Sequence, residues 1–214
     1  MYEDAFLTVC CKPVGVVSEA DHGKGMPELL SSQYEAAGKP SYIAGVHRLD
    51  KQVGGLMLFS RKKSFTGKLT GLISQREVKK EYLAVVWGIP KEPEGVLKDL
   101  LYHDPKTNKT FPVTRMRRGV REASLAYRVL ETKEDISLVG VTLHTGRTHQ
   151  IRVQFASRGL PLVGDVRYGS PNCHCDPALW SHCLQFPHPA TGQTLSILCP
   201  PPDCFPWNQF SIKK

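Results

Sequence analysis

Two short apolar runs constrain the fold of this chain more than any other feature. They are GGLMLFS at residues 54–60 and KEYLAVVW at residues 80–87, and both are punctuated at their ends. Runs of this length favour buried strands over helices. The second run is rich in β-branched and aromatic residues, and alternation places Tyr82, Ala84 and Val86 on one face. We therefore predict two strands of one sheet.

A helical stripe lies between the two runs. Phe65, Leu69, Leu72 and Ile73 recur at the spacing of one helical face, which predicts an amphipathic helix over residues 62–76. Patterns of the same kind predict further elements. We expect strands at 4–11, 123–131, 136–143 and 194–198, and helices at 26–36 and 147–158.

The remaining segments are turns and one irregular stretch. Lys12-Pro13-Val14-Gly15 predicts a turn, and the polar run ETKED joins the strands at 123–131 and 136–143. Residues 88–120 are the least regular part, and we interpret them as a β-rich excursion with loops that contact a partner. With no repeat and no clear linker, the simplest prediction is one α+β domain over residues 1–214.

The charge of the chain indicates the class of partner. Its 214 residues include 28 Lys and Arg against 20 Asp and Glu, which gives a formal net charge of +8. A basic protein favours nucleic acid or an anionic membrane surface as a partner. No apolar run is long enough to span a bilayer, and the N-terminus MYEDAFLTVCCK has neither a secretory nor an Arg-rich targeting pattern.

Seven cysteines, an odd number, indicate reduced thiols in the cytoplasm. The cluster Cys173-His174-Cys175, followed by His182 and Cys183, invites comparison with a zinc site. Structural zinc ligands are normally paired with two to four residues between them, and the spacing here is tighter. We therefore expect a solvent-exposed loop beside buried thiols, and no metal.

One carboxylate with several cations forms the strongest chemical pattern. His47-Arg48-Leu49-Asp50 precedes the first apolar run, and Arg147 and Arg152 lie in the run HTGRTHQIRVQF a hundred residues later. A single cleft that held these groups would suit an enzyme acting on an anionic polymer. The alternative is a purely structural ion pair of Asp50 with Arg48 or Arg152, which is common in proteins.

Other catalytic patterns are absent from the sequence. Asp50 has no second acid at short spacing, which argues against glycosidase chemistry. The chain contains no GxxxxGK[ST] loop, no G-x-S-x-G elbow and no HExxH. His144 and His149 are five residues apart, so they do not share a helical face as two metal ligands would.

Four motifs in order closely resemble the RluA-type family of RNA pseudouridine synthases. They are HRLD, GLMLFSRKKS, REVKKEYLAVVWG and TGRTHQIRVQFASRGLPLVGDVRYG. The opening YEDAFLTVCCKPVGVVS and the closing LWSHCLQFPHPATGQTLSILCPPP are similar too, so the resemblance covers nearly the whole chain. It implies a mixed, largely antiparallel central sheet with flanking helices and a basic cleft across it.

The resemblance also implies a reaction and a role for each of five residues. Uracil would be detached from its ribose within RNA, rotated, and rejoined through carbon. Asp50 would attack the substrate or assist elimination at the sugar, and Arg48 would fill the space left by the flipped base. Tyr82 would stack on uracil and take a proton, while Arg152 would pair with the aspartate and Ile151 would line the pocket. No metal or organic cofactor is implied.

Several of these residues also have a plain structural interpretation. We expect His47, His144 and His149 to orient loops, and Tyr82 has the position of a core residue. The run at 61–63 fits the solvated start of a helix. The cations of the irregular segment and one motif arginine are better candidates for phosphate contact than this run. They are Arg115, Arg117, Arg118 and Arg147.

The chain departs from the family pattern in two places. Val53-Gly54-Gly55 follows HRLD where relatives usually have Thr-Ser-Gly, so two hydroxyls are lost beside the catalytic loop. We expect the second departure to be the lack of the small N-terminal RNA-binding domain that many relatives carry. We therefore expect a monomer whose single catalytic domain recognises structured rRNA or tRNA alone or with another protein.

Two functions of different classes follow. The first is an active RNA pseudouridine synthase, and the second is a catalytically silent RNA-binding protein or RNA chaperone on the same fold. The retained Arg48, Asp50, Tyr82 and Arg152 favour the enzyme, because a binding protein has no need of the whole set. A metal-dependent hydrolase is a distant third.

Overall fold

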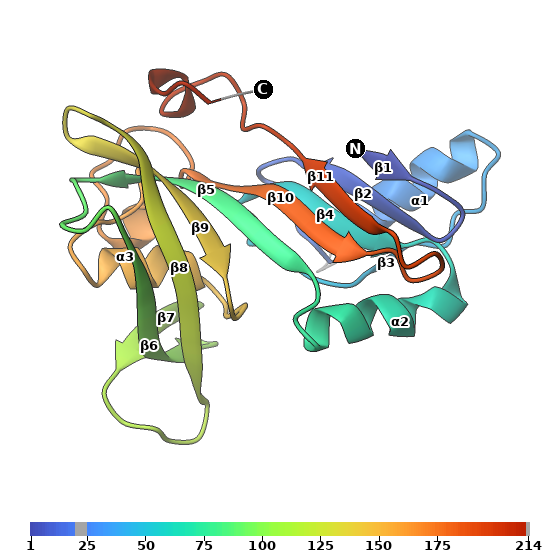
Figure 1. Ribbon diagram of the computed structural model, residues 1–214, viewed down its shortest axis with the longest axis horizontal. Coiled ribbons are helices and arrows are strands. Elements are labelled where there is room, and N and C mark those ends of the chain that lie inside the picture. The colour runs from blue at the N-terminus through green and yellow to red at the C-terminus, as the bar shows by residue number, and fades with distance from the viewer. Residues whose placement is uncertain (20–24, 213–214) are drawn as a thin grey trace. The chain divides into compact units, whose positions relative to one another are not determined.

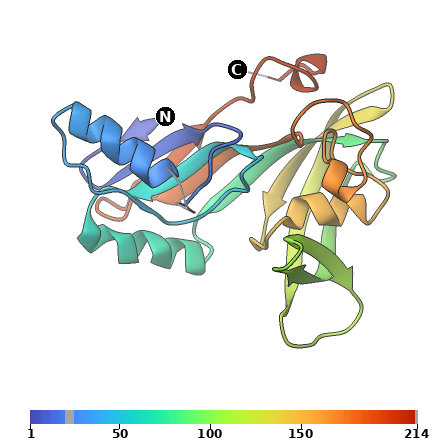
Figure 2. The same ribbon diagram turned by 180° about the vertical axis from the view of Figure 1, so that it is seen from behind.

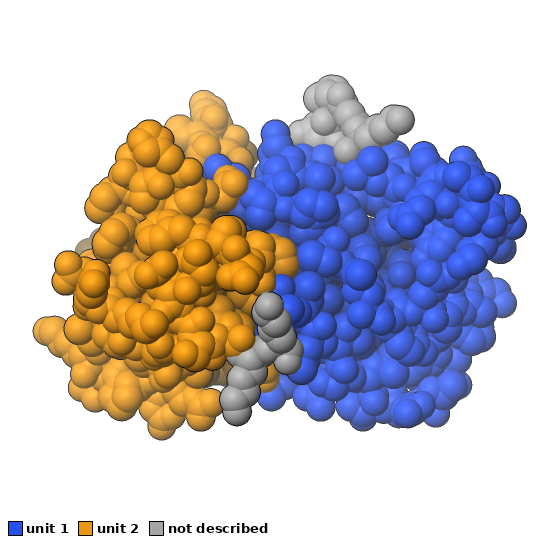
Figure 3. All heavy atoms as spheres, turned by 90° about the horizontal axis from the view of Figure 1, so that it is seen from above, with its two compact units in different colours: residues 1–80, 181–200 blue, residues 81–180, 201–214 orange. Residues whose placement is uncertain are grey.

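The computed structural model describes residues 1–19 and 25–212, and it divides into two compact units (Figure 3). Unit 1 comprises Met1–Lys80 and Ser181–Pro200, and unit 2 comprises Glu81–Trp180 and Pro201–Lys214. Among the described residues, no helix combines the length and apolarity needed to cross a bilayer.

Unit 1 is built on a sheet in which early strands of the chain are followed by late ones (Figure 1). Its order is β1–β2–β4–β10, with β3 paired to β4 and β11 paired to β10. The pairings β1–β2, β2–β4, β3–β4 and β10–β11 are antiparallel. The bounds are β1 Tyr2–Glu3, β2 Leu7–Lys12, β3 Ala44–Gly45, β4 Gly54–Ser60, β10 Leu179–Pro187 and β11 Thr194–Leu198.

Helices cover both faces of this sheet, which explains why β4 is buried along its whole length. Leu69 of α2 (Lys63–Ser74) packs with Leu56, Leu58 and residues of β2, β10 and β11 in one apolar cluster. Helix α1 (Met26–Ala36) lies across the opposite face, as Figure 2 shows. The apolar run at 54–60 therefore lacks alternation because water reaches neither side.

Unit 2 is a second run of antiparallel strands, in the order β5–β9–β8–β6–β7. Helix α3 packs against β6 and β7, with Val153 against Leu101, Ala123 and Tyr168. The bounds are β5 Lys79–Trp87, β6 Glu94–Asp104, β7 Lys109–Val113, β8 Val120–Lys133, β9 Ile136–Leu143, α3 Gln150–Ala156, η1 Val166–Tyr168 and η2 Trp207–Gln209.

Most of the expected elements are confirmed, including the α+β class, α1 and the strands β4 and β11 at the predicted bounds. The strand predicted at 4–11 is confirmed from Leu7 onward, as part of β2, and is wrong over residues 4–6. The Asp4 carboxylate accepts hydrogen bonds from the backbone N–H groups of Phe6 and Leu7, at 2.7 and 2.9 Å. This turn separates β1 from β2. The sequence patterns also missed β10.

The predicted start of the third helix at Arg147 is wrong as well. The helix begins at Gln150, because the side-chain oxygen of Gln150 accepts hydrogen bonds from the Arg147 backbone and the Thr145 hydroxyl. His149 precedes the helix in the left-handed region, with φ 55°. The polar segment HTGRTH at residues 144–149 is thus a folded turn that places Arg147 outside the helix.

Gly55 is the glycine on which the start of β4 depends. Its φ is +109°, and a Cβ atom there would lie 2.3 Å from the Ser181 carbonyl oxygen. Gly55→Ala should therefore lower the free energy of unfolding by at least about 2 kcal/mol. Urea denaturation measures the change. Gly67→Ala in α2 is the matched control, since that position is open, and it should gain about 0.5–1 kcal/mol.

Candidate active site

Asp50 lies on a loop of unit 1 that several buried contacts hold in place. The loop precedes β4, and the Val53 N–H donates to the Asp50 carbonyl at 3.0 Å to close a turn. On the other side of the turn, the Ser18 hydroxyl donates to the Leu49 carbonyl at 2.6 Å and accepts from the Leu49 N–H at 2.9 Å. The backbone on both sides of the carboxylate is therefore fixed.

Lys12 is the central contact of this loop. Its side chain is fully buried, and its ammonium donates to the carbonyls of Pro13, Val16 and Lys51 at 2.9, 2.7 and 3.2 Å. Burial lowers the pKa of Lys12 to about 8, and the negative charge of Asp50 opposes that shift. A lysine ammonium has three N–H donors, and all three have carbonyl partners here.

Arg48 and Asp50 differ in their surroundings although they are two residues apart. The Arg48 side chain is exposed, and its guanidinium lies 3.7 Å from the Glu19 carboxylate, which is exposed too. Such a pair contributes little stability. Asp50 is half-buried on the fixed turn. The loop therefore combines a positioned carboxylate with a long cationic side chain that is available to a ligand.

His47 has the structural role expected of it. Its Nε2 accepts a hydrogen bond from the backbone N–H of Leu58 in β4, at 3.0 Å. Burial, with a smaller effect from the charge of Lys80, lowers the pKa of His47 to about 3. The imidazole is therefore neutral at physiological pH, and it ties the start of the HRLD motif to the sheet.

In unit 2, Arg152 is buried in a bidentate ion pair. Its Nε and a terminal nitrogen donate to the two carboxylate oxygens of Asp165 at 2.6 and 2.8 Å, and both side chains are almost fully buried. The guanidinium also lies over the Tyr168 ring, 5.2 Å from its centroid. Planar stacking and a forked pair together restrict Arg152 to one orientation.

Tyr168 connects this pair to β7 and to the turn before α3. Its hydroxyl oxygen accepts from the Thr110 N–H at 2.8 Å and lies 2.8 Å from His149 Nδ1. Burial raises the pKa of Tyr168. Sequence reasoning missed both Asp165 and Tyr168 as functional candidates. They lie in the run GDVRYG at residues 164–169. The acid three residues before a tyrosine in this run was the one sequence signal that could have indicated them.

Tyr82 and Ile151 are buried members of unit 2. Tyr82 is 6% exposed on β5, opposite Val141 of β9, and Ile151 is 3% exposed in the first turn of α3. Arg48 and Asp50 thus belong to unit 1, and the other three proposed site residues belong to unit 2. The pairing of Arg152 with Asp50 stays a prediction.

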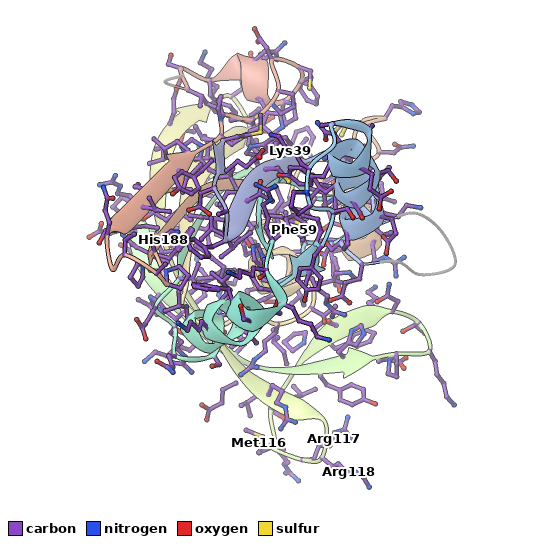
Figure 4. All side chains as sticks on the ribbon, turned by 90° about the vertical axis from the view of Figure 1, so that its right-hand side faces the viewer. Lys39, Phe59, Met116, Arg117, Arg118 and His188 are labelled. Carbon is purple, nitrogen blue, oxygen red and sulfur yellow. The ribbon has the colours of Figure 1, made fainter. Side chains whose placement is uncertain are left out.

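The basic segment forms an exposed loop between β7 and β8. Arg115, Arg117 and Arg118 are all exposed, and Arg117 and Arg118 project from the loop beside Met116 in Figure 4. The Arg117 guanidinium stacks on the Tyr102 ring at 5.2 Å. Arg147 is exposed as well and donates from Nε to the Glu122 carbonyl at 2.9 Å. No described group of three His, Cys, Asp or Glu side chains could hold a metal ion.

Known proteins resemble this chain over most of its length. Residues 7–157 match the family model described as RNA pseudouridylate synthase. That match covers more than half of the chain and includes Arg48, Asp50, Tyr82, Ile151 and Arg152.

The chain belongs to the RNA pseudouridylate synthase family.

Relatives and solved structures agree with this assignment. An uncharacterized RNA pseudouridine synthase of Synechocystis is 33% identical over 96% of this chain and 66% of its own length. Ribosomal large subunit pseudouridine synthase D of Nitrosomonas europaea is 35% identical over 95% of this chain and 62% of its own length. The chain thus spans about two thirds of the length of these relatives.

The fold resembles that of solved members. The structure of human RNA pseudouridylate synthase domain containing 4 matches with a TM-score of 0.80 at 22% identity, over 94% of this chain and 87% of that one. At this identity the likeness concerns the fold alone. It confirms the sheet and flanking helices that the motifs implied.

His47 makes the stability of the fold depend on pH. Its folded pKa of about 3 lies below its unfolded value of about 6.5, so its stabilising contribution is complete above pH 6.5. That contribution is lost as the pH falls, by up to about 1.4 kcal/mol per pH unit.

His47→Gln should therefore show a shallower loss of unfolding free energy between pH 6.5 and 4.5 than the wild type. Urea denaturation at a series of pH values measures both slopes. The exposed His144→Gln should keep the wild-type slope. Equal slopes for wild type and His47→Gln would contradict a buried neutral imidazole.

Proposed function

We propose that this chain is an RNA pseudouridine synthase that isomerises uridines in structured RNA, either rRNA or tRNA. The observation that carries the proposal is Asp50. It lies in the matched family region, on a turn that the buried Lys12 holds rigidly. A carboxylate fixed in this way is suited to one defined attack geometry.

The reaction exchanges one bond to the sugar for another. The bond between ribose C1′ and uracil N1 breaks, the detached uracil rotates, and a bond forms between C1′ and uracil C5. The hydrogen on C5 is then lost as a proton and N1 gains one, so atoms and electrons balance without an oxidant or reductant. No metal or organic cofactor is needed, and we propose that none is used.

We assign the chemistry at the sugar to Asp50, either as nucleophile at C1′ or as base in an elimination. Both roles require the ionised carboxylate. A uridine inside RNA structure must leave its stack before C1′ becomes accessible, at a cost of a few kcal/mol. We propose that the exposed Arg48 occupies the vacated space, where stacking and hydrogen bonds offset part of this cost.

The remaining roles fall to buried residues of unit 2. Tyr82 would stack on uracil and accept the C5 proton, Ile151 would line the pocket, and Arg152 would keep Asp50 ionised. A guanidinium close to a carboxylate favours the charged form. The support for Arg152 is its rigidity, because Asp165 and Tyr168 already restrict it to one orientation.

We assign binding of the RNA backbone to exposed arginines. Arg115, Arg117 and Arg118 on the β7–β8 loop would contact phosphates, with Arg147 as a further contact. Stacking on Tyr102 orients Arg117 without neutralising it. We further propose that the protein works as a monomer in the cytoplasm.

Asp50→Asn tests the catalytic assignment. The change conserves shape and removes the charge and the nucleophile, so uridine conversion should fall to background. RNA affinity and thermal stability should stay close to wild type. The measurement is pseudouridine formation in transcribed rRNA and tRNA substrates, alongside a binding titration and a thermal melt.

Asp203→Asn is the matched control, because Asp203 is exposed in unit 2 and has no part in the proposed site. It should convert uridine at the wild-type rate. Activity of Asp50→Asn within tenfold of wild type would overturn the role of Asp50. A wild-type protein that binds these RNAs and converts none would overturn the proposed function.

The salt dependence of RNA binding tests the basic loop. Each phosphate contact on single-stranded RNA contributes roughly 0.7 to the slope of log affinity against log salt. The triple change Arg115→Ala, Arg117→Ala and Arg118→Ala should therefore flatten the slope by up to about 2. Filter binding between low and physiological salt measures it.

A second triple variant controls for net charge. Lys62, Lys63 and Lys68 are exposed cations at and near the start of α2, and replacing them by alanine also lowers the formal charge from +8 to +5. Its slope should change less than that of the arginine variant. Equal slopes in the two variants would mean that the β7–β8 loop makes no phosphate contact of its own.

A further inference from the structure

Two cysteines outside the proposed active site lie close enough to react with each other. Cys173 and Cys175 are in the loop between η1 and β10, both are half-buried, and neither is in a disulfide. Their sulfur atoms are 2.9 Å apart. A disulfide bond is about 2.05 Å long, so the two sulfurs need to approach by less than about 1 Å.

The backbone of this loop holds the two side chains together. His174 between them has a φ of 54°, in the left-handed region that non-glycine residues rarely adopt. The Asn172 side-chain oxygen accepts a hydrogen bond from the His174 N–H at 3.1 Å, which stabilises that turn. The short distance between the sulfurs is therefore a property of a folded turn.

The loop is also anchored to the body of unit 2. The carbonyls of Cys175 and Asp176 pack onto Gly164, at 2.7 and 2.5 Å from where a Cβ atom of that residue would lie. The Ala178 N–H donates to the Val163 carbonyl at 2.8 Å, so the chain is fixed again after the turn. A dithiol that is held in this way has a high effective concentration of one thiol at the other.

We propose that Cys173 and Cys175 form a reversible intraloop disulfide by exchange with low-molecular-weight disulfides. The Cys173 thiolate attacks one sulfur of the external disulfide and expels one thiolate, which leaves a mixed disulfide on Cys173. Cys175 loses its proton and attacks the Cys173 sulfur, which expels the second thiolate. Two electrons pass from the dithiol to the external disulfide, and two small thiols are released.

The surroundings determine the order of the two cysteines. Burial, followed by the hydrogen bond with Cys173, raises the pKa of Cys175 to about 12, so Cys175 keeps its proton while Cys173 reacts. Attack on the mixed disulfide is then intramolecular over a very short path. Cys173 is therefore the attacking residue and Cys175 the resolving residue.

Cys204 is the competing partner for a disulfide with Cys175, because it is near enough to add electrostatically to the raised pKa of Cys175. The described residues include no third ligand placed to make this group a metal site. The test must therefore separate an intraloop disulfide from a bond to Cys204. The sequence helps, since chymotrypsin cleaves after Tyr168 and Trp180 and releases GSPNCHCDPALW, which contains Cys173 and Cys175 and no other cysteine.

The experiment uses the whole chain in mixtures of glutathione and glutathione disulfide. Remaining thiols are blocked with N-ethylmaleimide, and the chymotryptic peptides are measured by mass spectrometry. We expect the 169–180 peptide of the oxidised protein to be two hydrogens lighter, without a maleimide. The same peptide from the reduced protein should carry two maleimides. Two maleimides on this peptide at every redox ratio, or a crosslink to Cys204, would overturn the proposal.

Single variants test the order of attack. Cys175→Ser should accumulate a Cys173–glutathione mixed disulfide, more than about tenfold above wild type, because no resolving thiol remains. Cys204→Ser should still form the intraloop bond. Cys175→Ser without this adduct, or loss of the bond in Cys204→Ser, would overturn the assignment. None of these readouts depends on uridine conversion, so they stand apart from the proposed function.

Discussion

The buried ammonium of Lys12 is the contact on which the catalytic loop depends. It satisfies the carbonyls of Pro13, Val16 and Lys51 together, and so joins the end of β2 to the turn that carries Asp50. Burying a charge is costly unless its hydrogen bonds are complete, and here they are. Val53-Gly54 lacks the two hydroxyls of the Thr-Ser that relatives usually have at these positions. The Lys12 anchor does not depend on those hydroxyls, because the ammonium binds backbone carbonyls only.

Unit 2 uses a buried cation in a comparable way. Arg152 is held by Asp165 and by the Tyr168 ring, and Tyr168 is held in turn by Thr110 of β7. A rigid cation provides electrostatic stabilisation without reorganising during a reaction. In both units the groups assigned to chemistry or charge are therefore supported by residues from distant parts of the chain.

The candidate site was predictable from the sequence only as a set of motifs. HRLD and THQIR suggested Asp50, Arg48 and Arg152 as candidates, because these residue types stand in recognisable runs. The family-like motifs also contain Lys12, Asp165 and Tyr168, but the sequence alone assigned no role to these three residues. A supporting residue is defined by what it contacts, and its contacts come from segments up to 58 residues away, as with Thr110 and Tyr168.

The sequence by itself determined the elements whose signals are local. Helical apolar spacing was sufficient for α2 and a short continuous apolar run for β4, since burial of one face or of both faces leaves a pattern within a few residues. Tertiary structure alone decided that β10 is a strand and why Gly55 must be glycine. Each of these depends on a side chain or carbonyl that approaches from elsewhere in the chain, such as Ser181 at Gly55. No local pattern encodes such an approach, because it arises only when the strands pair.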